Sequence, residues 1–210
     1  MEYKIFNKSY NDLSFLQNIS LNENKYIFVF DFDLTLTNKT SDGTPKDTSY
    51  YIQLFGSEIK LLKLKEYLKK IIDNGYIIYI NTRALIRDID NILKNIELDS
   101  MIKEIKGSKS IENIFSPFNN IELEQYDLIN IYNNDILWAV KKVIYLNEII
   151  MQENVTQDNI LFFDDSIINI NTSKLNGYIN SFLIGMNESG LYGLDYLLIK
   201  LEQIMQILNI

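Results

Sequence analysis

Short, uninterrupted runs of apolar residues recur along the chain and predict buried strands. The clearest runs are Tyr26–Phe30, Tyr76–Ile80, Ile160–Phe163 and Ile179–Ile184, with a weaker one at Met101–Ile105. Continuous apolar runs of this length are typical of strands that are covered on both faces. The pattern therefore favours a parallel sheet.

Amphipathic segments with apolar residues at helical spacing lie between these runs. They are Glu58–Asp73, Leu85–Ile96, Ile136–Met151 and Leu191–Leu208. Asn74 and Gly75 directly follow the first segment and form a typical C-terminal helix cap. The alternation of strand and helix predicts an α/β fold, with a doubly wound, mostly parallel sheet and helices on both faces.

The length of 210 residues favours one domain, because domains average about 150 residues. We expect residues 25–210 to form it, with residues 1–24 as an N-terminal extension. Residues 107–135 exceed a normal connection and are a candidate small insertion. Residues 36–57 are too few for a domain-sized cap. We therefore expect at most a small cap and a substrate site that is accessible from solvent.

The chain contains no His and no Cys. Their absence excludes imidazole bases, thiol nucleophiles, disulfides and the usual zinc sites. Any chemistry must therefore depend on carboxylates, hydroxyls, Lys, Arg and a hard metal ion.

The net charge of −8 arises from 20 Lys and Arg against 28 Asp and Glu. Such a surface repels phosphate backbones, so we expect no nucleic-acid partner. The N-terminal residues lack the features of a secretory signal, and no apolar run approaches the ~20 residues of a membrane span. We therefore expect a cytoplasmic protein without a membrane partner, and the oligomeric state stays open.

Polar side chains follow three of the predicted strands directly. Asp31 and Asp33 follow the run Tyr26–Phe30, Thr82 follows Tyr76–Ile80, and Asp164 and Asp165 follow Ile160–Phe163. In open α/β sheets, ligands bind beyond the carboxyl ends of the strands, so these groups converge if the strands are neighbours. A cluster of carboxylates suits Mg²⁺, which relieves their repulsion and prefers oxygen ligands.

These residues resemble the motifs of the haloacid dehalogenase (HAD) superfamily of phosphohydrolases in order and spacing. The resemblance covers residues 26–190. The D-x-D-x-T motif is matched by Asp31, Asp33 and Thr35, and the Thr after the second strand by Thr82. The motif lysine is matched by Lys141 or Lys142, and the acidic pair by Asp164 and Asp165. Within the superfamily, the magnesium-dependent phosphatase branch is most similar. It shares a Thr-Arg pair, here Thr82-Arg83, and an Asn and glycines after the acidic pair, here Asn169, Gly177 and Gly185.

The resemblance implies a role for each matched residue. Asp31 is the nucleophile that forms an aspartyl-phosphate, and Asp33 is the general acid and base. Thr82 binds the transferred phosphoryl group, and Thr35 is a further candidate for substrate binding. The predicted lysine neutralises charge on the phosphoryl oxygens and on the nucleophile. Metal ligation falls to four residues, namely Asp31, Asp33 through its backbone carbonyl, Asp164 and Asp165.

The choice between the two lysines follows from helical spacing. Ala139, Val143 and Leu146 lie on the apolar stripe of the predicted helix, Lys142 flanks that stripe, and Lys141 lies opposite it. We therefore select Lys142 as the catalytic lysine and keep Lys141 as the alternative.

Each motif residue also has a purely structural interpretation. Asp164 or Asp165 could cap the following helix, and Thr82 could cap another. Lys142 could be a solvated lysine on the flank of its helix. We interpret Arg83 as a structural or surface arginine and leave it out of the catalytic set.

The sequence as a whole predicts a Mg²⁺-dependent phosphomonoesterase that acts on a phosphorylated small molecule or protein. Two alternatives stay open. One is a phosphatase acting on polynucleotide ends, which the negative charge disfavours. The other is a catalytically idle HAD scaffold that binds a partner through residues 107–135.

Overall fold

A computed structural model describes residues 26–41, 46–118, 133–185 and 190–210. The predicted N-terminal extension and the central part of the candidate insertion, residues 119–132, lie outside these ranges. The division of the chain into an extension, a domain and an insertion therefore stays a prediction.

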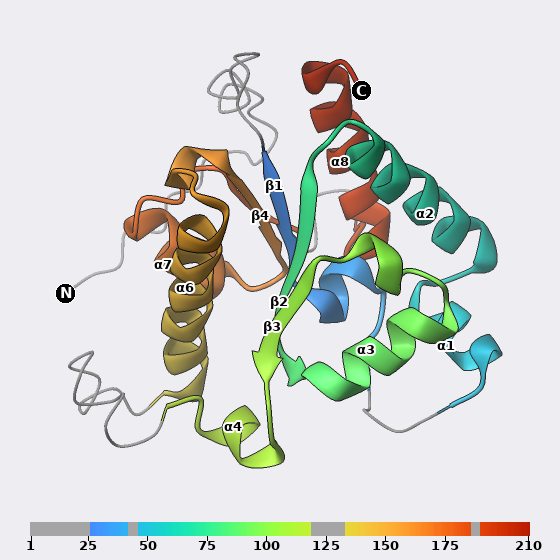
Figure 1. The fold of residues 1–210 in the computed structure, drawn as a ribbon. Coiled ribbons are helices and arrows are strands. Elements are labelled where there is room, and N and C mark those ends of the chain that lie inside the picture. Colours follow the sequence, from blue (N-terminus) through green and yellow to red (C-terminus); the bar gives the residue numbers. More distant parts are fainter. Residues whose placement is uncertain (1–25, 42–45, 119–132, 186–189) are drawn as a thin grey trace.

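A parallel sheet with the strand order β3-β2-β1-β4-β5 forms the centre of the described structure (Figure 1). The strands are β1 (Ile27–Phe30), β2 (Ile77–Leu85), β3 (Glu104–Ser108), β4 (Ile160–Asp164) and β5 (Ser181–Leu183). The predicted α/β class and parallel sheet are confirmed. Because β1 lies between β2 and β4, the three strands that end in polar groups are neighbours.

Three strands differ from the prediction by more than one residue, and one of them is β5, which is the shorter segment Ser181–Leu183 within the predicted run Ile179–Ile184. We expected the second strand to end at Ile80, where its apolar run ends, but β2 continues through Leu85. The weak run Met101–Ile105 is displaced, because Asp99–Met101 forms a short 3₁₀ turn and the strand begins at Glu104. β3 is an edge strand in which Glu104 and Lys106 pair with each other at 2.7 Å, so it lacks the continuous apolar run of a central strand.

Helices cover both faces of the sheet, as predicted (Figure 1). α6 (Asn134–Glu153) and α7 (Ile167–Leu175) pack on one face, while α1 (Thr48–Leu54), α2 (Glu58–Asp73), α3 (Ile86–Asn95) and α8 (Leu194–Leu208) pack on the other. The short helix α4 (Ile111–Phe115) lies beyond the carboxyl end of β3. Within the described ranges, no helix has the combined length and apolar character that crossing a bilayer requires.

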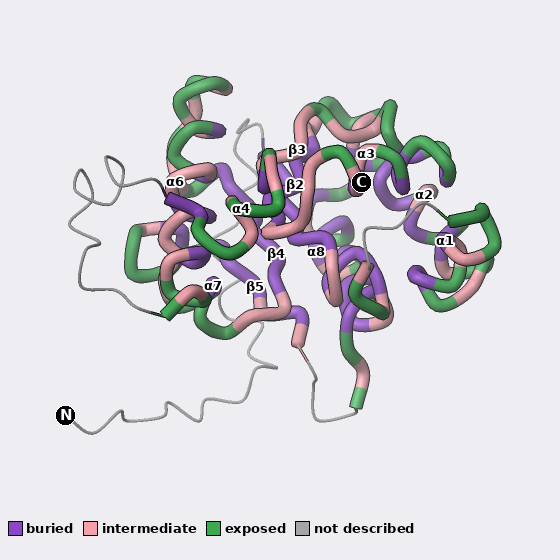
Figure 2. Tube along the Cα trace, turned by 90° about the horizontal axis from the view of Figure 1, so that it is seen from below, coloured by how far each residue is buried: buried purple, intermediate pink, exposed green. Residues whose placement is uncertain are grey.

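The central strands are apolar on both faces and separate two hydrophobic cores. Phe30 and Phe163 face the side of α2, α3 and α8, and Phe163 stacks on Phe30 and on Phe182 with ring centroids 4.9 and 4.8 Å apart. Val29 and Phe162 face α6 and α7. In Figure 2 the strands accordingly form a buried centre, while exposed residues lie on the surrounding helices. This burial holds the strand ends, and the residues that follow them, in fixed positions.

Candidate functional site

Asp31 lies where β1 ends, at the centre of the carboxyl edge of the sheet. Its backbone N–H donates to Phe163 O of β4 at 2.8 Å, so the nucleophile candidate is tied to the neighbouring strand. The chain then turns sharply through Phe32–Leu36, where Leu34 has a φ of 59°. The Thr37 hydroxyl accepts a hydrogen bond from Leu34 N at 3.1 Å. This bond supports a left-handed conformation that a leucine rarely adopts.

Lys142 connects the ends of β1 and β4 from the middle of α6. Its Nζ lies 2.8 Å from Asp31 Oδ1 and 2.6 Å from Asp164 Oδ2, and its side chain is 3% exposed. The interpretation as a solvated lysine is therefore wrong. The alternative, Lys141, places its ammonium 4.8 Å from the centre of the Phe118 ring. Lys142 is thus the lysine that reaches the predicted carboxylates.

Asp164 is fully buried and has hydrogen bonds to both carboxylate oxygens. Oδ2 contacts Lys142, while Oδ1 accepts from Ser166 N and from Asn169 Nδ2, each at 2.8 Å. Ser166 is the residue that caps α7, so the interpretation of the acidic pair as a helix cap is wrong. Asp164 is instead fixed from three directions at the end of β4.

Asp165 completes a group of three carboxylates with Asp31 and Asp164. Each residue offers an oxygen, and these oxygens all lie within 4.8 Å of one another. With Lys142 as the bridging cation, the group keeps a formal charge of −2. Such an all-oxygen, negatively charged set fits a hard divalent cation. The described residues therefore support a metal site at this edge of the sheet.

The pKa values of this group reflect burial and mutual repulsion. Burial raises the pKa of the Asp31 carboxyl well above its usual range, Lys142 opposes this shift, and the charges of Asp164 and Asp165 add to it. Burial and the charge of Asp164 raise the pKa of Asp165 to about 6. Burial alone would lower the pKa of Lys142, but Asp164 and Asp31 outweigh burial and raise it. The lysine is thereby held in its charged form.

Asp33 lies outside the group of three carboxylates and lines a hollow of the described structure. Its Oδ1 accepts from Ser41 N at 2.6 Å, and its Oδ2 accepts from the Ser41 hydroxyl at 3.2 Å. Burial raises the pKa of Asp33, although the bonds from Ser41 oppose this effect. The Asp33 carboxylate is absent from the described carboxylate group. Its predicted metal contact therefore depends on its backbone carbonyl, as the resemblance implies.

Thr82 lies inside β2 rather than after it, in a bulge of that strand. Asn81 pairs with Lys106 and Leu85 with Ser108, so β2 uses four steps where β3 uses two. A side chain at Gly107 would place its Cβ 2.9 Å from Ala84 O, so glycine permits this close approach. The structure caps α3 at Leu85, so the interpretation of Thr82 as a helix cap is wrong.

The two predicted substrate-binding threonines are both buried. Thr82 is 1% exposed, and its hydroxyl accepts from Ala84 N at 3.2 Å. Thr35 is 0% exposed, and its hydroxyl has no hydrogen-bond partner among the described residues. Their roles in substrate binding stay predictions.

Sequence reasoning missed three residues that organise the site. Thr37 supports the turn after Asp31, Ser41 holds Asp33, and Asn81 Nδ2 donates to Lys142 O at 3.0 Å. Thr37 and Ser41 lie where the chain has no periodic pattern. Asn81 is adjacent to the predicted Thr82, and a polar residue at the end of an apolar run was its only signal in the sequence.

Comparisons with solved structures place this fold among known proteins. A hypothetical protein from Xanthomonas campestris is 10% identical and matches with a TM-score of 0.55 over 96% of this chain and 93% of its own. The 3-deoxy-D-manno-octulosonate 8-phosphate phosphatase of Moraxella catarrhalis, solved with magnesium, phosphate and the sugar acid, is 14% identical, with a TM-score of 0.54 and 94% of each chain covered. A Legionella pneumophila protein, described under subfamily III A of the HAD hydrolases, is 9% identical, with a TM-score of 0.50 over 96% of this chain and 93% of its own. No family model and no curated protein matches the chain.

The chain therefore has the fold of the HAD-superfamily phosphatases, and the resemblance read from its motifs is confirmed at the level of fold. The carboxylate group at the carboxyl edge of the sheet is the site that this fold positions. The closer similarity to the magnesium-dependent phosphatase branch stays a prediction.

Proposed function

We propose that this protein is a Mg²⁺-dependent phosphomonoesterase that acts through an aspartyl-phosphate on Asp31. The observation that carries the proposal is the bridging position of Lys142, 2.8 Å from Asp31 and 2.6 Å from Asp164 within a group of three carboxylates. A structural ion pair needs one carboxylate per lysine. The excess negative charge around Lys142 has a ready explanation in a cation and an anionic substrate.

Asp31, Asp164 and Asp165 would hold the metal, together with the carbonyl of Asp33. The metal supplies charge neutralisation for the phosphoryl oxygens and for the carboxylates. The fixed position of Lys142 adds a positive charge that needs no reorganisation during the reaction, which is how preorganised groups stabilise a transition state.

The reaction proceeds in two displacements. In the first, an oxygen of Asp31 attacks phosphorus, the bond to the leaving oxygen breaks, and Asp33 donates a proton to that oxygen. In the second, Asp33 removes a proton from water, the water oxygen attacks phosphorus, and the bond to Asp31 breaks to release phosphate. Asp33 suits both steps because it lies two residues from the nucleophile and lines the hollow beside it.

The substrate would be a phosphorylated small molecule or protein. The net charge of −8 disfavours a polyanionic partner, so nucleic-acid ends are the weaker candidate.

The test compares the wild type with Asp31→Asn on a panel of phosphomonoesters, with Mg²⁺ and with EDTA. We expect turnover only by the wild type with the metal. A single turnover in heavy-oxygen water should place one labelled oxygen in the released phosphate and none in the carboxylate of Asp31, because water attacks phosphorus in the second displacement and the bond between phosphorus and Asp31 breaks. Equal rates for both proteins, or rates that EDTA leaves unchanged, would contradict the proposal.

A further inference from the structure

The hollow beside Asp33 has a volume of about 470 Å³ and is lined by residues of three segments. Ser41 follows the turn after β1, Arg83 to Asp88 span the end of β2 and the start of α3, and Ile111 and Ile114 belong to α4. Its size lies within the ~300–1,000 Å³ that small-molecule sites usually have. If Asp33 protonates the leaving oxygen, as the proposed function requires, the hollow lies where the alcohol part of the substrate must lie.

One wall of the hollow is apolar and partly open to solvent. Ile111 is 61% exposed, and Ile114 and Leu85 lie beside it in the lining. Ser110 caps the first turn of α4, because its hydroxyl accepts from Asn113 N at 3.4 Å, and Trp138 Nε1 of α6 donates to Ile114 O at 2.9 Å, which fixes α4 against that helix. A ligand with an apolar body would cover these aliphatic groups, and removing such surface from water is favourable.

The two arginines of the lining are held very differently. Arg83 donates from Nε to Ile114 O at 3.2 Å and pairs with Asp135 at 3.3 Å, so it ties β2 to α4 and α6. Arg87 lies on the first turn of α3 with a side chain that is 76% exposed, and its Nε lies 3.1 Å from Asp88 Oδ1. Exposed ion pairs contribute little free energy. An anionic ligand can therefore compete with Asp88 for the guanidinium of Arg87.

We propose that the hollow binds the alcohol portion of a small phosphomonoester that carries both an apolar body and a carboxylate. The apolar body lies against Ile111 and Ile114, and the carboxylate pairs with Arg87. A guanidinium fits a carboxylate through two parallel N–H···O bonds, which makes the contact specific as well as attractive. This proposal rests on the proposed function and adds the class of substrate to it.

The test uses two substrates that differ only in charge, para-carboxybenzyl phosphate and para-carbamoylbenzyl phosphate, both with Mg²⁺. We expect the wild type to favour the carboxylate ester by about tenfold in kcat/KM, as one charge-assisted contact allows. Arg87→Gln should remove this preference, mainly through KM. Lys94→Gln removes the same charge from the same helix outside the hollow, and its side chain is also exposed, so the preference should persist.

A second variant tests the apolar wall. Ile111→Ser should raise KM for both benzyl esters several-fold, because the exposed position lets the variant fold while the apolar contact is lost. An unchanged KM for both esters would overturn this part of the proposal. If the wild type shows no preference for the carboxylate, or if Arg87→Gln keeps it, the carboxylate site is overturned.

Acetyl phosphate separates this proposal from the proposed function, since its small acyl group leaves the hollow unused. Hydrolysis of acetyl phosphate that depends on Asp31, without hydrolysis of either benzyl ester, would overturn the assignment of the hollow alone. If none of the three substrates is hydrolysed, the phosphatase proposal fails and the assignment of the hollow fails with it.

Discussion

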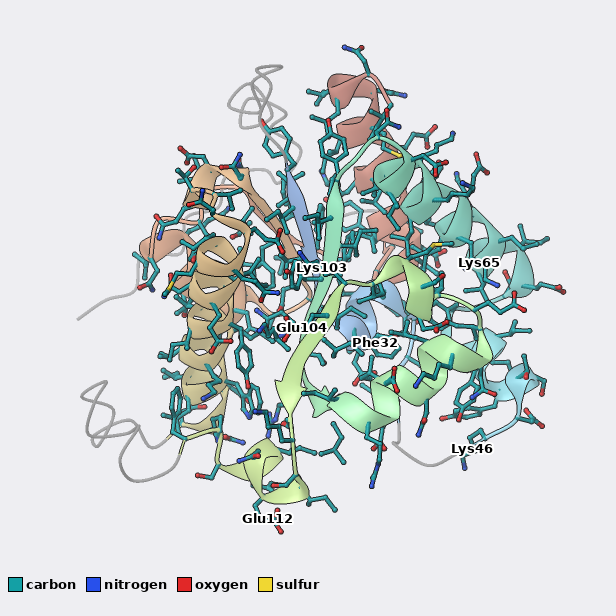
Figure 3. The ribbon with its side chains drawn as sticks, viewed as in Figure 1. Phe32, Lys46, Lys65, Lys103, Glu104 and Glu112 are labelled. Carbon is teal, nitrogen blue, oxygen red and sulfur yellow. The ribbon has the colours of Figure 1, made fainter. Side chains whose placement is uncertain are left out.

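Lys142 and Glu153 lie on the same helix, α6, and each is buried among polar partners of a different kind. Lys142 contacts Asp31 and Asp164 in a group that keeps an excess of negative charge. Glu153 accepts a hydrogen bond from the Tyr79 hydroxyl and pairs with Lys103, so its single charge is balanced. Lys103 directly precedes Glu104, the first residue of β3 (Figure 3), so it lies at the amino end of that strand, whereas the candidate site lies at the carboxyl edge of the parallel sheet.

The comparison shows that a buried charge does not by itself mark a functional site. The pKa of Tyr79 is also raised, first by burial and then by its bond to Glu153, although Tyr79 lies outside the group of three carboxylates. What distinguishes the Lys142 group is its charge imbalance, together with the hollow next to Asp33. Structural networks also perturb pKa values, so imbalance and access are the more useful criteria.

The largest expected effect comes from Lys142→Met. We expect kcat to fall by at least ~10³-fold, because a preorganised charge at the phosphoryl group is lost. In EDTA, the free energy of unfolding should fall by about 3 kcal/mol, since the buried carboxylates lose their cation. Urea unfolding and a phosphate-release assay measure the two effects. Lys141→Met is the matched control, with a small effect on both, and full activity of Lys142→Met would contradict the assigned role.

Metal binding should depend on the carboxylates around Lys142 and be independent of Glu153. Mg²⁺ at a hundred times its Kd is expected to raise the free energy of unfolding by about 2.7 kcal/mol, because it binds only the folded chain. Asp165→Asn should lose most of this gain, since it removes one carboxylate of the group. Glu153→Gln should keep the gain. Thermal unfolding with and without Mg²⁺ decides the matter, and an equal gain in all three proteins would contradict a metal at the carboxylate group.

Glu153 and its partners Tyr79 and Lys103 should affect stability without affecting activity. Glu153→Gln is expected to lower the free energy of unfolding by about 2 kcal/mol, because it weakens the hydrogen bond from Tyr79 and removes the ion pair with Lys103. We expect kcat to stay within about twofold of the wild type, because Glu153 lies outside the carboxylate group. Glu148→Gln, an exposed change on the same helix, is the control for stability. A loss of activity larger than the loss of stability would contradict the comparison.

The sequence predicted the fold well where strands are buried on both faces. β1 and β4 are short apolar runs that end directly at Asp31 and Asp164, so both the strands and their polar ends were visible. β3 was displaced because an edge strand with alternating charges gives a weak apolar signal. The continuation of β2 through Thr82 depends on a bulge that Gly107 permits, and this is a tertiary contact.

The candidate site was predictable in its residue types and less so in its contacts. Helical spacing placed Lys142 beside the apolar stripe, but only the packing of α6 on the sheet shows that its ammonium reaches two carboxylates. The bond from Ser41 to Asp33 joins residues of an aperiodic segment, so no pattern could predict it. The hollow required the positions of three separate segments.

The smallest expected effect tests whether Asn81 positions Lys142. Asn81 is fully buried, and its Nδ2 donates to Lys142 O at 3.0 Å, which fixes one turn of α6 against the end of β2. Asn81→Ala should lower the free energy of unfolding by about 1 kcal/mol, the usual contribution of one such bond. We expect kcat to fall several-fold with KM nearly unchanged, because the ammonium is needed most in the transition state.

Asn147→Ala is the matched control for that variant, because it removes a hydrogen bond of the same helix, from the Tyr178 hydroxyl at 2.7 Å, away from the carboxylates. It should cost a similar amount of stability and leave kcat unchanged. If both variants lower kcat equally, the effect follows from helix stability alone. If only Asn81→Ala lowers kcat, the Asn81 side chain, which connects β2 to α6, also sets the position of Lys142. The geometry of the charged group at this edge of the sheet then depends on a neutral amide.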